Sequence, residues 1–169
     1  MTSVALQVKL GIALTASDDG TVNLFDTQHG AFVRSFRHPT NCALHNVCVS
    51  GEGEVLMFSS DDRTAHVFAL NGVEPLASVA FHDGKVRAIC ATQSSSPGYF
   101  VVAEDSSASV HRSHDLSLCA RLRDAGGAIA CASLHERQEG CGRLDVLLGL
   151  ECGVVVPWIV ELDWASTIC

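Results

Sequence analysis

The sequence predicts an all-β protein in which about four repeated, four-stranded units form a β-propeller-like array, whether complete or incomplete. The first observation is a repeat: residues 17–26 recur 43 residues later as residues 60–69, and weaker copies follow at 103–112 and 150–158. The second is the alternation of apolar and polar residues, as in Thr21-Val22-Asn23-Leu24, which is typical of half-buried strands. A repeat of about 40–45 residues built on short strands indicates propeller blades.

Turns rich in Gly, Ser, Asn and Asp divide each unit into the strands of a single domain, 1–169. The first unit, 3–36, is expected to begin with strands at 4–9 and 12–16. The predicted strands of the second unit, 43–80, are 43–49, 54–59, 64–69 and 75–80. Those of the third unit, 86–122, are 86–91, 99–103, 108–112 and 117–122. Those of the fourth unit, 128–164, are 128–134, 144–149, 153–158 and 160–164.

Composition narrows the class of protein. Of the 169 residues, 47% are hydrophobic and 18% are charged, which is enough apolar material for a real core. No run approaches the roughly 18–20 apolar residues of a membrane helix, so we expect a soluble protein that does not bind membranes. The net charge is −8 and the 11 Lys and Arg residues are not clustered, which argues against nucleic acid as a partner.

The eight cysteines are spaced irregularly and form no C-x-x-C pair. Most lie among apolar neighbours, as in Asn46-Val47-Cys48-Val49, where a free thiol behaves as a small buried hydrophobe. A reducing compartment fits this pattern better than a disulfide-bonded secreted domain. We therefore expect a cytoplasmic protein, with the nucleus as another intracellular possibility.

The sequence contains no motif specific enough to indicate an enzyme, a metal site or a cofactor site. The paired carboxylates at 18–19 and 61–62 occupy the same place in two repeats, which favours turn capping over acid–base chemistry. His111, His114 and Cys119 could suggest zinc, but strand residues three apart point to opposite faces. The nucleophile-elbow pattern G-x-S-x-G is absent from the sequence. The expectation is a non-enzyme without catalytic residues, metal ligands or cofactor.

The repeated segments resemble the WD40 family of β-propellers. Ser17-Asp18-Asp19-Gly20-Thr21 followed by Leu24-Phe25-Asp26 is similar to its Ser/Thr-x-Asp-x-Thr turn and Trp-Asp strand end, with Phe for Trp. The resemblance implies that the turn aspartates tie their turns and orient the histidine of the same unit. It also places Pro157 in a strand expected to be central, where proline is poorly tolerated. The structural positions it implies are Ser17, Asp19, Phe25, Asp26, His38, Ser60, Asp62, Phe68, His82, Asp105 and Trp158.

The same resemblance implies a scaffold that mediates protein–protein interactions within a multiprotein complex. Its binding face would consist of the loops from second to third strands and from fourth strands to the next unit. The candidate binding residues there are Arg37, Asp61, Arg63, Asp83, Lys85 and Glu104. Two alternatives are a propeller enzyme with a channel-centred site and a truncated unit that completes another propeller. Four units fall short of a usual WD40 ring, so a longer propeller, a homo-oligomer or closure with another chain stays open.

Overall fold

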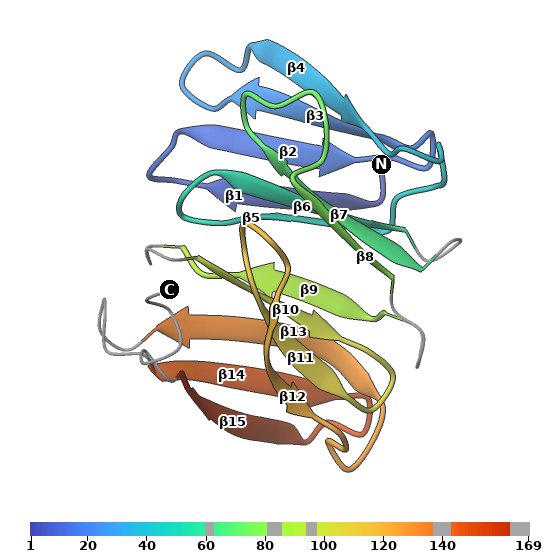
Figure 1. Cartoon of the computed structure of the whole chain (residues 1–169), viewed down its shortest axis with the longest axis vertical. Helices are drawn as coiled ribbons and strands as arrows, with labels where there is room; N and C mark the ends of the chain where they lie inside the picture. Colours follow the sequence, from blue (N-terminus) through green and yellow to red (C-terminus); the bar gives the residue numbers. More distant parts are fainter. Residues whose placement is uncertain (60–62, 81–85, 94–97, 137–142, 163–169) are drawn as a thin grey trace.

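The computed structural model describes residues 1–59, 63–80, 86–93, 98–136 and 143–162, and throughout these residues the chain is all-β (Figure 1). Four antiparallel sheets follow one another in chain order, which confirms the predicted fold class. The first sheet contains β1 (Ser3–Gln7), β2 (Ile12–Ala16), β3 (Thr21–Asp26) and β4 (Phe32–Arg37). The second contains β5 (Asn46–Val49), β6 (Glu54–Ser59), β7 (Thr64–Ala69) and β8 (Ala77–Ala80).

The third sheet contains β9 (Ala88–Ala91), β10 (Tyr99–Ala103), β11 (Ala108–Arg112) and β12 (Leu118–Leu122). The fourth contains β13 (Ile129–Glu136), β14 (Arg143–Leu150) and β15 (Val155–Glu161). In every sheet the strands lie side by side in chain order, as successive hairpins produce. The described chain contains no helix with the length and apolarity that crossing a membrane requires.

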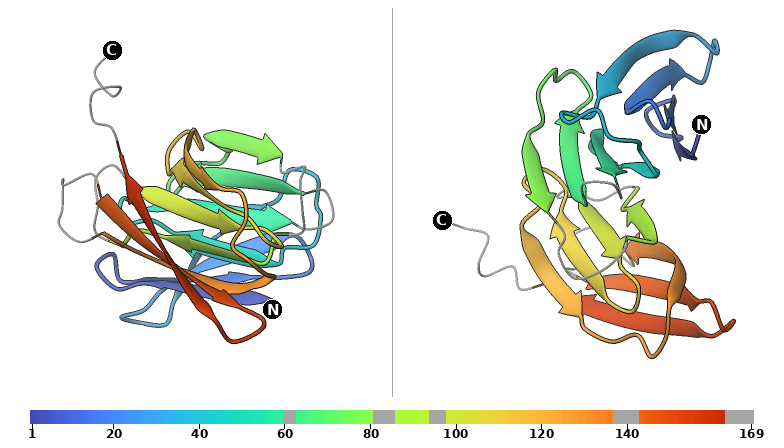
Figure 2. Two further views of the ribbon diagram at one scale, coloured as in Figure 1. Left: turned by 90° about the horizontal axis from the view of Figure 1, so that it is seen from below. Right: turned by 90° about the vertical axis from the view of Figure 1, so that its right-hand side faces the viewer.

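The four sheets are arranged around an axis. The first strands of neighbouring sheets contact one another: β1 packs on β5, β5 on β9, and β9 on β13. The first strands therefore lie on the inner, concave side of an arc, and β4, β8 and β12 lie on its outer side (Figure 2). Over the residues that the structure describes, the arc does not close, since the first and last sheets each pack on one neighbouring sheet. This is an incomplete propeller.

Three hydrophobic clusters fill the three junctions between successive sheets. Alternation along the second sheet explains how one sheet serves two junctions: Val47 and Val49 pack toward the first sheet, whereas Cys48 packs toward the third. At the first junction, the Arg34 guanidinium also donates hydrogen bonds to the carbonyls of Leu70 and Gly72, at 3.0 and 2.9 Å. Strands buried on both faces thus explain the near-continuous apolar runs in the middle of the sequence.

Most strands lie where the alternation predicts them, and the fourth sheet is the main correction. The two strands predicted at 153–158 and 160–164 are a single strand, β15, which pairs with β14 from Gly149↔Val155 to Arg143↔Glu161. The unit therefore shows three strands rather than four among the described residues; residues 163–169 lie outside them. Ile159 and Val160 continue the alternation through the predicted break, and no Gly or Asn supplies a turn there.

The position of Pro157 follows from the same correction. Within the described chain, β15 has one neighbouring strand, β14, and Pro157 pairs with Leu147. It was expected in a central strand, but it lies in the outermost described strand of its sheet. A proline is tolerated on an edge strand because its missing N–H removes no ladder hydrogen bond on the open side.

Candidate protein-interaction face

Loops of two kinds emerge at the same end of the sheets, and we call this end the loop face. It consists of the loops from second to third strands and from fourth strands to the next sheet; the described loop segments are 17–20, 38–45, 104–107, 123–128 and 151–154. Backbone hydrogen bonds join the two kinds of loop, from Leu44 N–H to Ser17 C=O (3.2 Å) and from Ile129 N–H to Asp105 C=O (2.7 Å). Each loop is therefore held by a neighbour.

Asp19 is built into the turn of the first sheet. Its Oδ1 accepts hydrogen bonds from the Thr21 N–H at 3.0 Å and the Thr21 hydroxyl at 2.6 Å, which lower the pKa of the Asp19 carboxyl. Gly20 has a φ of +77°, and a Cβ there would lie 3.0 Å from the Cys42 carbonyl oxygen. This geometry is that of a capped tight turn with little room for a side chain.

His38 lies fully buried beneath the loop that enters the second sheet. Its Nδ1 lies 2.9 Å from the Thr40 hydroxyl, and its Nε2 lies 3.2 Å from the Thr64 hydroxyl. Thr64 also contacts His66, whose ring meets that of His38 edge to face with centroids 4.5 Å apart. The sequence placed His38 at a structural repeat position but did not single out His66, which occupies a buried position of β7.

An ion-pair cluster that the sequence analysis missed joins the third and fourth sheets at the loop face. The Arg87 Nε donates to Asp105 Oδ1 at 2.8 Å, and the Arg87 guanidinium lies 3.7 Å from Glu151. The hydrogen bond to Asp105 raises the pKa of Arg87. Asp105 was predicted as a repeat position only, because nothing local in the sequence shows that Arg87 and Glu151 approach it.

Beside this cluster is a hollow of about 440 Å³, lined by Ser106, Ser107, Arg121 and Arg123. Glu104, predicted as a binding residue, is only 5% exposed: it accepts a hydrogen bond from Ser107 and lies 3.7 Å from Arg121. Glu104 therefore supports the hollow from below and does not offer its carboxylate to a partner. The sequence did not flag the two arginines, although both stand at the end of a predicted fourth strand.

Among the other predicted repeat positions, Ser17 begins the turn before β3, and Phe25 and Phe68 lie in β3 and β7. Trp158 lies in β15, half-buried against the cluster between the third and fourth sheets. The rest divide into three groups. Arg37 and Arg63 are exposed at the loop face, and Arg37 donates to Asn41 Oδ1 at 3.2 Å. Asp26 is the last residue of β3, at the opposite end of the first sheet, where its carboxylate contacts His29 and accepts a hydrogen bond from the Gln28 N–H. The remaining loop positions lie outside the described residues: Ser60, Asp61, Asp62, His82, Asp83 and Lys85.

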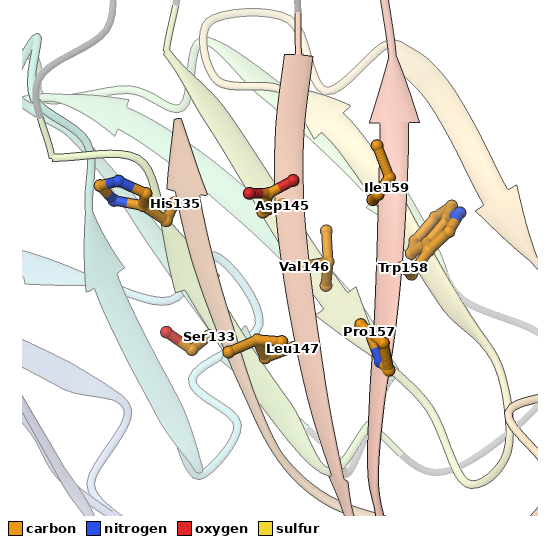
Figure 3. A pocket seen from close by; sticks show the side chains of 8 residues that line it. All are labelled: Ser133, His135, Asp145, Val146, Leu147, Pro157, Trp158 and Ile159. Atoms are coloured by element: carbon orange, nitrogen blue, oxygen red, sulfur yellow. The ribbon is translucent and has the colours of Figure 1, made fainter. Parts of the chain in front are cut away.

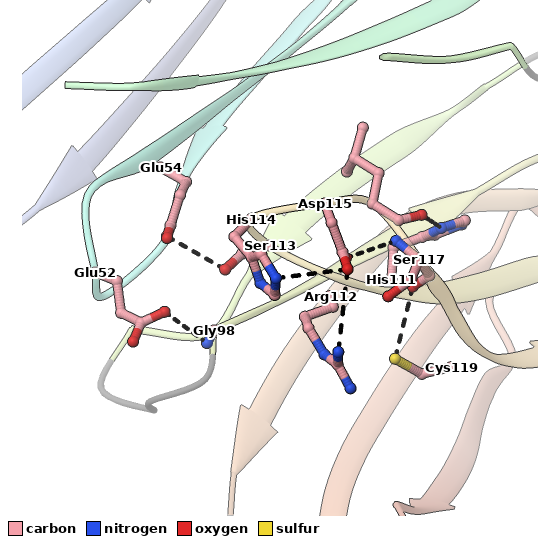
Figure 4. A network of polar contacts seen from close by, with 11 residues as sticks. Glu52, Glu54, Gly98, His111, Arg112, Ser113, His114, Asp115, Ser117 and Cys119 are labelled. Atoms are coloured by element: carbon pink, nitrogen blue, oxygen red, sulfur yellow. Dashed lines mark hydrogen bonds and ion pairs between the residues drawn. The ribbon is translucent and has the colours of Figure 1, made fainter. Parts of the chain in front are cut away.

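The candidate zinc residues have other partners (Figure 4). The Nδ1 of His111 lies 2.9 Å from the Leu116 carbonyl oxygen, and its Nε2 lies 2.8 Å from the Ser109 hydroxyl. His114 lies 3.5 Å from Asp115, and the Cys119 thiol is directed at the Ser117 carbonyl. Over the residues that the structure places, no three His, Cys, Asp or Glu side chains gather closely enough to hold a metal ion.

Radially stacked antiparallel sheets, with a Ser-x-Asp-x-Thr turn capped by Asp19 in the first sheet, define a segment of a WD40-type β-propeller. Comparison with known families narrows this class. Residues 1–164 match the neurobeachin β-propeller domain, and the chain belongs to that family.

Among curated proteins, the chain is similar to BEACH domain-containing protein B of Arabidopsis thaliana, with 26% identity over 162 residues. That match covers 95% of this chain and 6% of the relative, so the chain spans a small part of that protein. Among solved structures, it resembles the computationally designed Ika4 protein (TM-score 0.68, 16% identity, covering 94% of this chain and 90% of that one). It also resembles Raptor of Chaetomium thermophilum (TM-score 0.66, 17% identity, covering 96% and 15%). The structural likenesses show the fold.

Proposed function

We propose that the chain is a non-enzymatic scaffold segment that binds partner proteins through its loop face, within a multiprotein complex. The observation that carries this proposal is the arginine hollow at the third sheet. Arg123 is exposed, and the described part of the chain gives it no ion-pair partner. Ser106 adds a hydroxyl donor beside it, whereas the Ser107 hydroxyl already donates to Glu104. An acidic side chain of a partner would satisfy this combination of charge and hydrogen-bond donors.

The rigidity of the sheets beneath the loops supports the same role. Ser106 and Asp105 accept backbone hydrogen bonds from Ala125 and Ile129, both at 2.7 Å, so the rim of the hollow is tied to the next sheet. A preformed site loses little conformational entropy on binding, which is how a scaffold of fixed loops gains affinity. The mixed charge around the hollow, from Arg87, Asp105 and Glu151, suits selective recognition more than strong non-specific attraction.

Family membership agrees with a scaffold at a coarse level, since the relatives are propeller domains inside BEACH proteins. We infer an intracellular location from the thiols. Six cysteines at described positions are free, and Cys48 and Cys90 are inaccessible enough that burial raises the pKa of both thiols, that of Cys90 to about 12. Such thiols stay protonated and inert at neutral pH, whereas the exposed free thiols of Cys131 and Cys152 suit a reducing compartment.

The test is affinity purification of the tagged chain from its own cells, with quantitative mass spectrometry of the proteins that co-purify. Arg123→Glu should reduce recovery of the specific partner at least about tenfold, because it reverses one interfacial charge. Lys9→Glu is the matched control: it makes the same change of charge in the β1–β2 turn, at the other end of the sheets. A chain that recovers no specific partner, or equal losses from both variants, would contradict the proposal.

A further inference from the structure

The first sheet has one face that packs on the second sheet and one that packs on nothing within the described chain. We call the latter the entry face. Strand register aligns one uncharged apolar row across all four strands: Leu6, Ala13, Phe25 and Phe32. The adjacent row, Val4, Thr15, Asn23 and Ser35, is also uncharged. Arg37, which pairs with Thr21, lies in the next row of this face, so the uncharged part is the patch formed by the first two rows. An uncharged patch with several large apolar side chains, on a chain of net charge −8, is typical of an interaction surface.

Equivalent positions in the second repeat indicate which kind of surface the entry face would contact. Val47 and Val49 of β5 stand 43 residues after Val4 and Leu6 of β1. Val47 and Val49 are 4% and 1% exposed because the first sheet covers them, whereas Val4 and Leu6 are 59% and 55% exposed. The same positions are thus buried wherever a preceding sheet exists.

The aromatic position of the repeat behaves in the same way. Phe68 is buried against Phe36 of the preceding sheet, with ring centroids 5.7 Å apart. Its equivalent 43 residues earlier, Phe25, contacts only the exposed Phe32 among the described aromatic rings, edge to face at 5.9 Å. The entry face therefore has the composition of an inter-sheet junction of which the other half is missing.

The fourth sheet offers that other half on its face directed away from the third sheet, which we call the exit face. Three rows of residues cross the strands on this face. The first is Ser133, Leu147 and Pro157, the second is His135, Asp145 and Ile159, and the third is Cys131, Gly149 and Val155. Leu147 and Ile159 are 48% and 47% exposed. They line a shallow groove of about 370 Å³ that runs across the three strands, with Asp145 and His135 at one end (Figure 3).

We propose that the entry face of one copy of this chain docks on the exit face of a second copy. At each internal junction, the face of one sheet that corresponds to the entry face packs on the face of the preceding sheet that corresponds to the exit face. Among the described residues, the entry face of the first sheet and the exit face of the fourth sheet pack on no other sheet. Two copies joined head to tail at both ends form one closed ring of eight sheets, within the range of four to eight typical of propellers. Closure covers both open faces at once and leaves no further copy to add.

Sedimentation or light scattering measures this directly, at protein concentrations from about 1 to 100 μM. The expected mass is twice 17.9 kDa, and the dimer fraction should rise with salt because each copy carries a charge of −8. Phe25→Asp and Ile159→Asp should each yield monomers, since each variant damages both junctions of its own dimer. Val73→Asp, at a strongly exposed turn position away from both faces, is the control and should stay dimeric.

Mixing the two variants distinguishes head-to-tail docking from other arrangements. A Phe25→Asp copy retains a sound exit face and an Ile159→Asp copy a sound entry face, so the mixture should regain a dimer through one intact junction. Circular dichroism of each variant checks that the sheets are folded. A wild-type chain that is monomeric throughout the range, one that forms unlimited larger species, or folded variants that fail to complement each other would overturn the proposal.

Discussion

His111 illustrates how burial changes the chemistry of one residue. Its Nδ1–H donates to the Leu116 carbonyl, so in the neutral ring its Nε2 accepts from the Ser109 hydroxyl. Burial is the main cause of its lowered pKa. In the unfolded chain, a histidine takes up a proton near about pH 6.5. Between the folded pKa and about pH 6.5, the folded protein therefore binds fewer protons at His111 than the unfolded chain does. Protonation in this interval favours the unfolded chain.

The resulting prediction concerns stability and pH. The contribution of His111 to stability is complete above about pH 6.5 and falls as the pH drops toward its lower folded pKa. Urea unfolding from pH 7.5 to 5 should show a free energy of unfolding that decreases with acidification, and His111→Gln should flatten part of that decrease. Identical pH profiles for wild type and His111→Gln would contradict the prediction.

At the scale of the strand, the third strand of each sheet carries the repeat. Its bounds in the second and third sheets could be predicted from the repeat and its turn residues, and β7 and β11 match the predicted 64–69 and 108–112. The end of the fourth unit could not, since β15 contains Pro157 and lacks a turn signal. Edge position, which the sequence does not encode locally, decides whether proline is acceptable.

Equivalent aromatic residues should differ in their contribution to stability. Phe68→Ala removes a fully buried ring from a two-sheet junction and should cost about 3–5 kcal/mol of unfolding free energy. Phe25→Ala removes a ring in an open pair and should cost about 1 kcal/mol. Chemical denaturation in the Ile159→Asp background, where no second copy covers Phe25, provides the comparison.

Phe68→Leu keeps this comparison usable if Phe68→Ala does not fold, and it should still cost more than Phe25→Leu. Equal losses at the two positions would show that the neighbouring sheet contributes little to burying the repeat aromatic.

At the scale of the whole molecule, the described residues pack the two middle sheets on both faces and the two outer sheets on one. Stability in an array of repeats comes from each unit and its contacts with its neighbours, so outer units open more easily. The hydrophobic clusters follow the same pattern, since the second and third sheets each contribute to two clusters and the first and fourth sheets each contribute to one.

Hydrogen exchange should report this directly. In the Ile159→Asp chain, amides of β6 and β10 should exchange more slowly than those of β2 and β14, although all four strands lie inside their own sheets. Mass spectrometry of peptides from a single exchange series makes the comparison. Uniform protection across the four sheets would mean that the chain opens as one cooperative unit and would contradict this prediction.

On the loop face, the positions of single residues could be predicted, but their grouping could not. Arg37 and Arg63 could be placed on it from their positions after strands and in turns. Arg87, Arg121 and Arg123 could not be recognised as a group, because Arg87 belongs to the start of the third unit and the other two to its end. They meet at the same loop region as Asp105 and Ser106 only when the sheet is folded.

The amino-acid sequence by itself determined the class of fold: period, alternation and turn residues are local properties, and each repeat carries them. Tertiary structure alone decided which side of each sheet is covered and that Glu104 is buried beneath a hollow. It also decided that, within the described chain, the first and last sheets each have one face that no other sheet covers. The physical reason is that burial depends on what the neighbouring sheet brings into contact. Leu6 and Val49, at equivalent positions of the repeat, are therefore both apolar, yet Leu6 is exposed and Val49 is buried.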